Sequence, residues 1–581
     1  MVRKGMAFLG RLGAIFWQAL TIGRRVVANL FFLALIVVIL VLIFADREPP
    51  VPPKAALVFD PTGAIVEQAA EPLLLDRFYG TVRREQTALH NIIDTIDHAA
   101  TDDRIQVLVL QLDQFGPVGL SQLQEIGRAL ERFKAGGKKI IAAGESYDQH
   151  RYYLAAHADR LYLHPMGQVW IRGYGVYRSY LKRALDKLKV NLHVYRRGEY
   201  KSALEPLIRT DMSEAAREAN RAWLQTLWEA YKTDVARLRD FDASRIEDLV
   251  NHLDRHLESV DGDAARLALD SDLVDALKSR DEVRRELIEL VGEDPETQTF
   301  SQIGYQAYFE FIRPRLHDSR SSENSVGVIT AQGMIMEGDQ PAGRIGAESL
   351  SALIRQARED EQVKALVFRI YSGGGSALAS EIIRRELDLT REAGKPVVVS
   401  MSSVAASGGY WIALGADEIW AEPTTITGSI GIFAAFPTLE DALDAVGVDS
   451  DGVGTTNLAD AFDPTRPLNP MVASVMQQSI EHGYRRFIEQ VAHSRGMSIE
   501  DVRAAARGRV WSGVAAQERN LVDRLGGLKD AVRRAAEMAR IEDDYQVMYI
   551  ERPLTAREAL IKKLEQWIGA ALSSTRPAEI T

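Results

Sequence analysis

The feature that most constrains the fold is an internal repeat. Residues 102–110 (DDRIQVLVL) resemble residues 360–368 (DEQVKALVF), and the same shift of 258 positions aligns 152–159 (YYLAAHAD) with 410–417 (YWIALGAD). In both copies, apolar runs of strand length alternate with helical patterns, which is typical of an α/β layer structure. The sequence therefore predicts two tandem α/β repeats, which we place at 55–318 and 325–548.

The second copy presents one serine in the way that a nucleophile is presented. Ser407 follows an apolar run and precedes two glycines and a helix-like apolar segment, so we expect it at a strand-to-helix turn. Upstream, three glycines at 373–375 follow the predicted strand 365–370 and would allow backbone N–H groups to approach a ligand closely. A hydroxyl beside free backbone donors is what an acyl-transfer site needs. The alternative is a small-residue turn packed between helix and sheet.

The candidate base lies in the first copy. Gln149 stands where the second copy has Ser407, so the first copy lacks the nucleophile, but it carries Lys201 in a turn after the apolar segment 190–195. A lysine can take the proton of a serine only when it is neutral, so its pKa must fall from about 10.4 to about 7–8. The alternative is a surface lysine paired with Glu205.

Composition and motif content speak against several other functions. The 581 residues include no cysteine, which excludes disulfides and cysteine–zinc sites, and no HExxH pattern occurs, so we expect no metal and no cofactor. No histidine lies between residues 318 and 481, which disfavours a Ser–His pair. A net charge of −11 without long basic tracts argues against nucleic acid as a partner.

The N-terminus predicts a membrane anchor. Residues 26–45 are an apolar run interrupted only by Asn29, which is long enough to cross a bilayer, although a cleaved signal peptide is the competing interpretation. Residues 1–25 are basic without acidic residues, which places them in the cytoplasm and the body across the membrane. Residues 46–54 form a proline-rich linker, and 549–581 are expected to form a C-terminal amphipathic helix and tail.

Two motifs on this tandem arrangement resemble a known family. The segments YKSALEP at 200–206 and SMSSVAASGGYWIA at 400–413 resemble the long form of signal peptide peptidase A, the protease IV family, and the resemblance covers about residues 55–545. It implies a Clp-protease/crotonase-like fold in which the first repeat supplies the base, Lys201, and the second supplies the nucleophile, Ser407.

The same resemblance implies further site residues and partners. The oxyanion donors would be the backbone N–H groups of Gly374 and Gly408, and Ser429 would orient the lysine. One departure is Gly373, where the family usually has proline; this loosens the loop. The family implies a homotetramer in the bacterial inner membrane, with its catalytic body on the periplasmic side, that degrades hydrophobic, already cleaved signal peptides.

Two other functions remain open from the sequence. A crotonase-like acyl-CoA enzyme needs a glycine oxyanion hole and no nucleophile, but the predicted anchor places the body away from cytoplasmic acyl-CoA. A non-catalytic membrane scaffold built from inactive repeats is the non-enzymatic alternative.

Overall fold

The structure is a computed structural model, and it describes residues 21, 23–33, 36, 51–69, 86–318, 322–341 and 343–552. Pro52–Glu71 and Arg84–Pro553 form one compact unit, and in the other unit residues 23–33 are helical. Within the described ranges, no helix has the length and apolar character needed to cross a membrane. Most of the predicted anchor, including 37–45, and the predicted C-terminal amphipathic helix lie outside the described residues.

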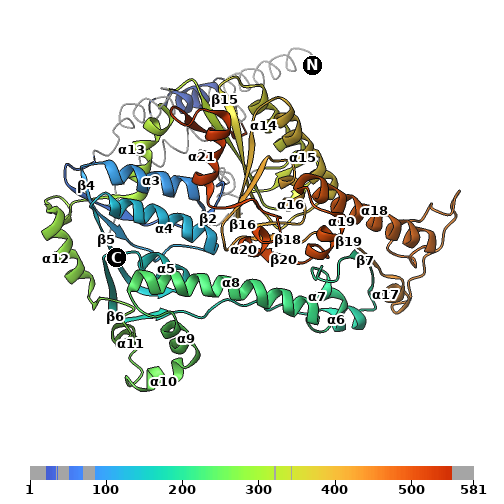
Figure 1. The fold of residues 1–581 in the computed structure, drawn as a ribbon, viewed down its shortest axis with the longest axis horizontal. Coiled ribbons are helices and arrows are strands. Elements are labelled where there is room, and N and C mark those ends of the chain that lie inside the picture. Colours follow the sequence, from blue (N-terminus) through green and yellow to red (C-terminus); the bar gives the residue numbers. More distant parts are fainter. Residues whose placement is uncertain are drawn as a thin grey trace, which may run out of the picture. The chain divides into compact units, whose positions relative to one another are not determined.

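The larger unit is α/β and contains two sheets of mainly parallel strands, one in each half of the chain (Figure 1). The first sheet has the order β11 (Gln302–Gly304), β1 (Ala55–Phe59), β4 (Ile105–Leu110), β5 (Lys139–Asp148), β6 (Arg160–Trp170) and β8 (Ala276–Leu277). The second has the order β20 (Val510–Ser512), β18 (Ile426–Gly428), β16 (Val397–Ala406), β15 (Val363–Ser372), β12 (Ser325–Gln332) and β22 (Gln546–Tyr549); β17 (Glu418–Ala421) also pairs with β16, and β21 (Arg524–Leu525) pairs with β17. Only β18 and β20 pair antiparallel within these two sheets as described.

Helices connect and cover these strands. In the first half they are α3 (Leu89–Thr101), α4 (Leu120–Ala135), α5 (Gln149–Ala155), α6 (Lys182–Lys187), α7 (Glu205–Ile208), α8 (Glu214–Arg239), α9 (Ser244–Asn251), α10 (Leu253–Glu258), α11 (Ala264–Asp270), α12 (Arg280–Val291) and α13 (Tyr305–Asp318). In the second they are α14 (Ala347–Glu359), α15 (Ala377–Glu392), α16 (Gly408–Ala413), α17 (Glu440–Asp444), α18 (Pro470–Arg495), α19 (Ile499–Ala505), α20 (Gly513–Gln517) and α21 (Leu528–Ala539). Short strand pairs complete the fold: β2 (Ala64–Val66) with β3 (Gln86–Ala88), β9 (Glu293–Asp294) with β10 (Thr299–Phe300), and β13 (Ile335–Met336) with β14 (Ile345–Gly346).

The central strands of the second sheet are buried on both faces, as their nearly continuous apolar sequences require. Phe368 and Val399 pack with residues of α14, α15 and α16 on one face. Val367 and Val398 pack with α21 on the other. The carboxyl end of β16, where the predicted nucleophile follows, is thus fixed by a core on each side of the sheet.

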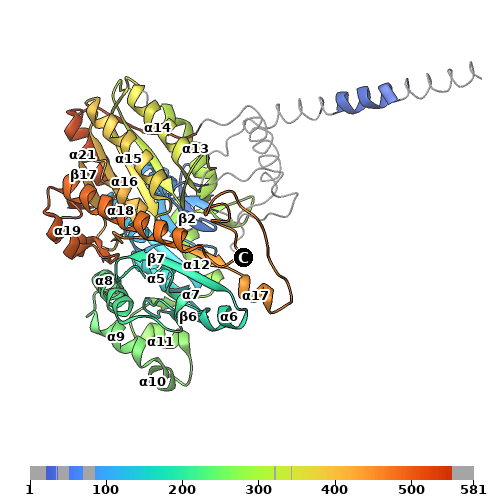
Figure 2. The same ribbon diagram turned by 90° about the vertical axis from the view of Figure 1, so that its right-hand side faces the viewer.

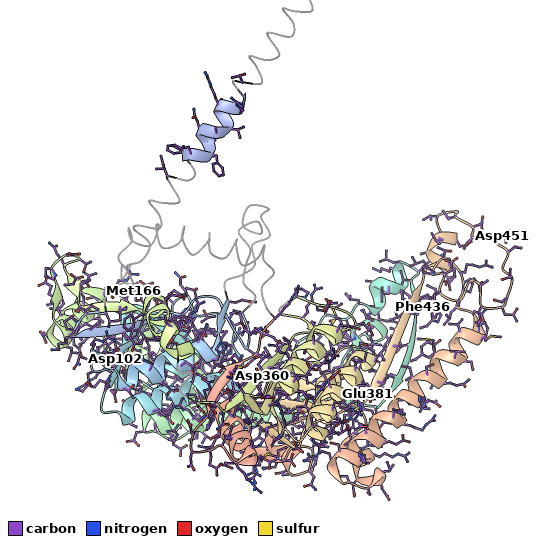
Figure 3. The ribbon with its side chains drawn as sticks, turned by 90° about the horizontal axis from the view of Figure 1, so that it is seen from above. Asp102, Met166, Asp360, Glu381, Phe436 and Asp451 are labelled. Atoms are coloured by element: carbon purple, nitrogen blue, oxygen red, sulfur yellow. The ribbon has the colours of Figure 1, made fainter. Side chains whose placement is uncertain are left out.

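The two halves share local hydrogen bonds as well as element order. The amine of Lys138 donates to the carbonyl of Asp102 at 2.6 Å, and the amine of Lys395 donates to the carbonyl of Asp360 at 2.5 Å. Asp102 is the residue directly after α3 and Asp360 the residue directly after α14, so each begins the turn that leads to the next strand; both are labelled in Figure 3. Each lysine therefore closes the same kind of helix-to-strand turn in its own half.

Buried ion pairs join the halves. Arg369 on β15 is 1% exposed and donates to Glu67, which follows β2, at 2.9 Å, and to Glu125 on α4. Arg128 on α4 pairs with Glu422 of the second half. A buried charge is tolerated only when it is paired and hydrogen-bonded, so these contacts fix the relation between the sheets.

A two-stranded antiparallel ribbon also crosses between the halves. It pairs β7 (Asn191–Arg197) of the first half with β19 (Ile432–Thr438) of the second. The long helix α18 packs against both strands (Figure 2), and Phe436 on β19 is labelled in Figure 3. Because β7 precedes Lys201 and β19 follows Ser429, this ribbon brings the two predicted site segments together.

Candidate active site

Ser407 lies at the turn between β16 and α16, as the sequence predicts. Its backbone has φ 56° and ψ −116°, which is uncommon for a residue with a Cβ. Its N–H donates to the carbonyl of Gly428 at 2.8 Å, and its own carbonyl accepts from Trp411 in α16. The strained turn is therefore held from both sides, by β18 and by the helix.

Lys201 reaches this serine from the other half of the chain. Its Nζ lies 2.8 Å from Ser407 Oγ, 2.7 Å from the carbonyl oxygen of Ser429 and 3.0 Å from Ser429 Oγ. A neutral amine has two N–H donors and one lone pair. With the two donors directed to Ser429, the lone pair is left to accept the proton of Ser407.

The surroundings of Lys201 favour the neutral amine. The residue is 5% exposed, and burial lowers its pKa from the ordinary value of 10.5 to about 7. Two nearby carboxylates that would oppose this shift are engaged elsewhere. Glu199 pairs with Arg507 at 3.0 Å, and Glu205 accepts from the N–H and hydroxyl of Ser213 at the start of α8. The alternative of a surface lysine paired with Glu205 is therefore wrong.

The two predicted oxyanion donors lie beside each other and next to the serine. A Cβ added to Gly374, which has φ 111°, would lie 2.8 Å from Ser407 Cβ and 2.9 Å from Gly408 N. Gly408 is the first residue of α16, a position whose N–H has no acceptor inside the helix. The Gly374 N–H donates to the hydroxyl of Ser372 at 3.1 Å, which in turn donates to the carbonyl of Gly333.

Sequence reasoning missed one part of the site. Residues 507–509 (Arg507, Gly508 and Arg509) contact both the segment that carries Lys201 and the segment that carries Ser429. They are about 300 positions from Lys201 in the sequence and match no motif. A glycine between two arginines was the only local signal.

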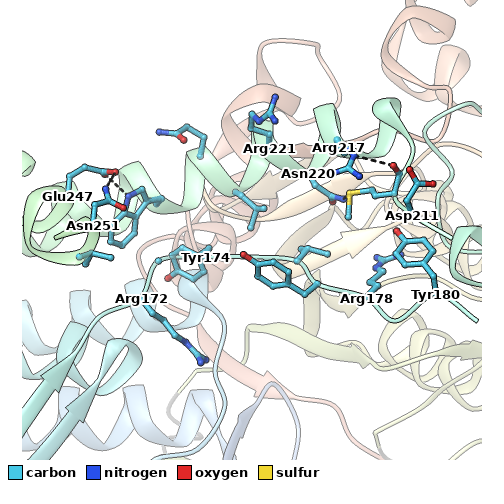
Figure 4. A pocket seen from close by; sticks show the side chains of 18 of the residues that line it. Arg172, Tyr174, Arg178, Tyr180, Asp211, Arg217, Asn220, Arg221, Glu247 and Asn251 are labelled. Carbon is cyan, nitrogen blue, oxygen red and sulfur yellow. Dashed lines mark hydrogen bonds between the residues drawn. The ribbon is translucent and has the colours of Figure 1, made fainter. Parts of the chain in front are cut away.

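A cavity of about 650 Å³ lies elsewhere in the first half (Figure 4). Arg172 and Tyr174 line one side of it, and Arg217, Asn220 and Arg221 of α8 line another. None of the predicted site residues contributes to its walls.

Comparison with known proteins identifies the family. The family model described as "Peptidase family S49" matches residues 132–293 and 390–542. The chain is also 40% identical over 576 residues to Protease 4 of Salmonella typhi, a match that covers 97% of this chain and 92% of that protein. The chain belongs to peptidase family S49. It is also 35% identical over 541 residues to Protease 4 of Haemophilus influenzae, covering 91% of this chain and 87% of that protein.

This S49 peptidase is a serine protease, so the predicted resemblance and enzyme class are confirmed. Both alternatives, the non-catalytic scaffold and the acyl-CoA enzyme, are overturned by membership in a peptidase family. Lys201 lies within the first matched segment, and Ser407 and Ser429 lie within the second. Among solved structures, a ClpP1 mutant from Listeria monocytogenes matches 38% of this chain and 99% of its own at 15% identity, with a TM-score of 0.25.

Proposed function

We propose that this S49 peptidase is a membrane-anchored endopeptidase that hydrolyses cleaved signal peptides through an acyl-enzyme, with Ser407 as nucleophile and Lys201 as general base. The observation that carries the proposal is the 2.8 Å distance between Nζ of a buried lysine and the hydroxyl at a strained turn. A serine becomes a useful nucleophile only when an adjacent base takes its proton.

Acylation follows from this arrangement. Lys201 Nζ takes the proton of Ser407 as Oγ bonds to the carbonyl carbon of the peptide, and the oxyanion accepts from the N–H groups of Gly408 and Gly374. For Gly374 to donate, its N–H must leave the hydroxyl of Ser372. The intermediate then collapses, the C–N bond breaks, and Lys201 gives its proton to the leaving amine.

Deacylation uses the same groups. Lys201 Nζ removes a proton from a water molecule as the water oxygen bonds to the ester carbon, and it then gives that proton to Ser407 Oγ as the ester C–O bond breaks. Ser429 holds the amine between the two steps through its carbonyl and its hydroxyl. No metal ion or cofactor takes part in these steps.

Apolar side chains near the serine support a hydrophobic peptide as substrate. The ring of Phe433 is 39% exposed, and its centre lies 6.0 Å from Lys201 Nζ. Met334 is 65% exposed and adjoins Ile335, whose N–H donates to the carbonyl of Gly374. Exposed apolar groups beside a reactive serine favour apolar segments of a chain over charged ones.

The remaining parts of the proposal concern architecture and location. We place the protein in a bacterial inner membrane, anchored by 26–45 with its body in the periplasm, as a homotetramer of chains that each contain two Clp-protease/crotonase-like repeats. The apolar run and the basic segment before it support the anchor, and the equivalent turns closed by Lys138 and Lys395 support duplication. Resistance of the full chain to alkaline carbonate extraction, and its digestion by protease added to spheroplasts, would test the location. Light scattering in detergent would test the subunit number.

The chemistry is tested by labelling the detergent-solubilised full chain with a fluorophosphonate across a pH series and mapping the labelled residue. We expect the label on Ser407, with a rate that rises through a midpoint near pH 7 and falls at least about 100-fold in Lys201→Ala. Ser403→Ala is the matched control, since this buried serine lies on the same strand and, within the described part of the chain, its hydroxyl has no hydrogen-bond partner. A label on another serine, or a wild-type rate in Lys201→Ala, would overturn the proposal.

A further inference from the structure

Residues 507–509, here named the RGR turn, join α19 to β20 and support the backbone of Lys201. The carbonyl of Arg507 accepts from the N–H of Tyr200 at 2.9 Å. Gly508 has φ 76°, and a Cβ added there would lie 2.7 Å from both N and Cβ of Lys201. The lysine backbone therefore rests directly on the one position of the turn that lacks a side chain.

The same turn binds the segment that receives the lysine amine. The N–H of Gly508 donates to the carbonyl of Ile430 at 2.8 Å, and the carbonyl of Arg509 accepts from the N–H of Ser429 at 2.7 Å. Ser429 in turn accepts from Lys201 Nζ. Three consecutive residues thus contact both the backbone of the Lys201 segment and the backbone of Ser429, which accepts hydrogen bonds from the lysine amine.

The side chain of Arg509 extends this connection. Its guanidinium lies 4.9 Å from the ring centre of Tyr200 and 4.4 Å from that of Trp511, and it pairs with Glu218 of α8 at 2.6 Å. The hydroxyl of Tyr200 also donates to Glu218. Arg509 is 16% exposed, so stacking and ion pairing both act in a partly desolvated place.

Other charged groups near the lysine segment are paired or point to its backbone. Arg507 pairs with Glu199, and Arg196 of β7 donates to the carbonyl of Lys201 at 3.3 Å. Arg196 also lies 3.8 Å from Glu205. These groups constrain the main chain around Lys201, and burial remains the cause of its lowered pKa.

We propose that the RGR turn is the positioning element of this site: Gly508, through its missing Cβ, and Arg509, through its stacked and paired guanidinium, hold Lys201 within hydrogen-bond distance of Ser407. The inference rests on the proposed roles of those two residues. Its physical reason is that base and nucleophile come from different halves of the chain, so each local displacement adds directly to the distance between them. A misplacement of about 1 Å can cost about 100-fold in rate.

Gly508→Ala provides the first test, with kcat and KM measured on an apolar fluorogenic peptide. We expect kcat to fall at least about 30-fold with KM within about twofold, because the added Cβ pushes the lysine backbone away. The midpoint of the pH profile should rise as the amine becomes more exposed; a pKa of about 9 would leave about 1% neutral amine at pH 7. Gly447→Ala is the matched control, since Gly447 has φ 78° and nothing within 4 Å of the added Cβ.

Arg509→Ala provides the second test and does not depend on backbone strain. We expect kcat to fall about 10-fold with a raised pH midpoint. Arg519→Ala is its control: Arg519 lies 3.8 Å from the ring centre of Trp511 but bonds to Ala515 and Glu518 in its own half. It should lower thermal stability without moving the pH midpoint.

The outcomes separate this inference from the proposed function. The role of the RGR turn would be overturned if Arg509→Ala kept the wild-type kcat and pH midpoint, and Gly508→Ala either kept both as well or failed to fold. If Lys201→Ala is inactive at the same time, the dyad survives and only the positioning role is lost. If Lys201→Ala reacts with the fluorophosphonate at the wild-type rate, the base assignment itself is wrong.

Discussion

Nζ of Lys201 lies 2.8 Å from Oγ of Ser407, although 206 positions separate the two residues in the chain. β7 precedes the lysine and β19 follows Ser429, and these strands pair over seven residues of each half. The ribbon brings the two segments together, and the buried ion pairs of Arg369 keep the sheets behind them in place. The distance is therefore a property of the whole unit.

The first prediction concerns pH. Because burial lowers the pKa of Lys201 to about 7 and only the neutral amine can accept a proton, kcat/KM should rise with pH and be half-maximal near pH 7. Lys201→Arg should be inactive throughout, since a guanidinium stays protonated. Initial rates from pH 5 to 9 measure both, and a profile flat across this range would contradict the assignment.

The second prediction concerns the stability cost of the same lysine. Its folded-state pKa is below its unfolded value, so the unfolded chain binds more protons between about pH 7 and 10.5, and stability should rise with pH across that window. Lys201→Met removes this cost and should raise the unfolding temperature at pH 7 by about 2 °C or more, with loss of activity. Calorimetry at pH 7 and pH 10 measures the unfolding temperatures of the variant and the wild type. The difference between them should be smaller at pH 10.

The third prediction compares two adjacent glycines. Gly374→Ala should lower kcat at least about 100-fold, because its φ of 111° and the contact with Ser407 leave no room for a Cβ. At Gly373 an added Cβ meets nothing within 4 Å and φ is outside the left-handed region. Gly373→Ala should therefore keep activity, and its free energy of unfolding should rise by about 0.4–1 kcal/mol because alanine restricts the unfolded chain. Loss of activity in both variants would show that the loop needs mobility instead.

The sequence carries local signals for part of this site and none for the contacts between the two halves. An apolar run followed by glycines predicted Ser407 at its turn, and an apolar segment before a turn predicted the place of Lys201, because strand patterns and glycine runs are local signals. The hydrogen bonds of the Glu205 side chain to Ser213 depend on where α8 begins, and they have no local sequence signature. Gly508 escaped notice for the same reason, since its role depends on a backbone that folds against it from the other half of the chain.

The fourth prediction concerns Ser429, whose hydroxyl lies 3.0 Å from Lys201 Nζ. Ser429→Ala should lower kcat about 10-fold with little change in KM, because the amine keeps the carbonyl acceptor and loses the hydroxyl. Ser429 has φ 53°, so serine and alanine both carry backbone strain there that glycine would relieve. Ser429→Gly should therefore be more stable than Ser429→Ala and equally slow. If the glycine variant recovers wild-type kcat, the hydroxyl does not orient the lysine.

The fifth prediction concerns His157, a buried histidine outside the site. It is 3% exposed, its ring nitrogens have no hydrogen-bond partner within the described part of the chain, and burial lowers its pKa to about 4. The unfolded chain binds the extra proton between about pH 6.5 and 4, so stability is lost as pH falls through that range, by up to about 3 kcal/mol. His157→Phe keeps an aromatic ring beside Tyr153 and should reduce this loss of stability. The free energy of unfolding from urea titrations at pH 7 and pH 4.5 measures it. The half-exposed His164→Phe, in the same half of the chain, should leave the loss intact; an unchanged pH dependence in His157→Phe would show that other groups cause it.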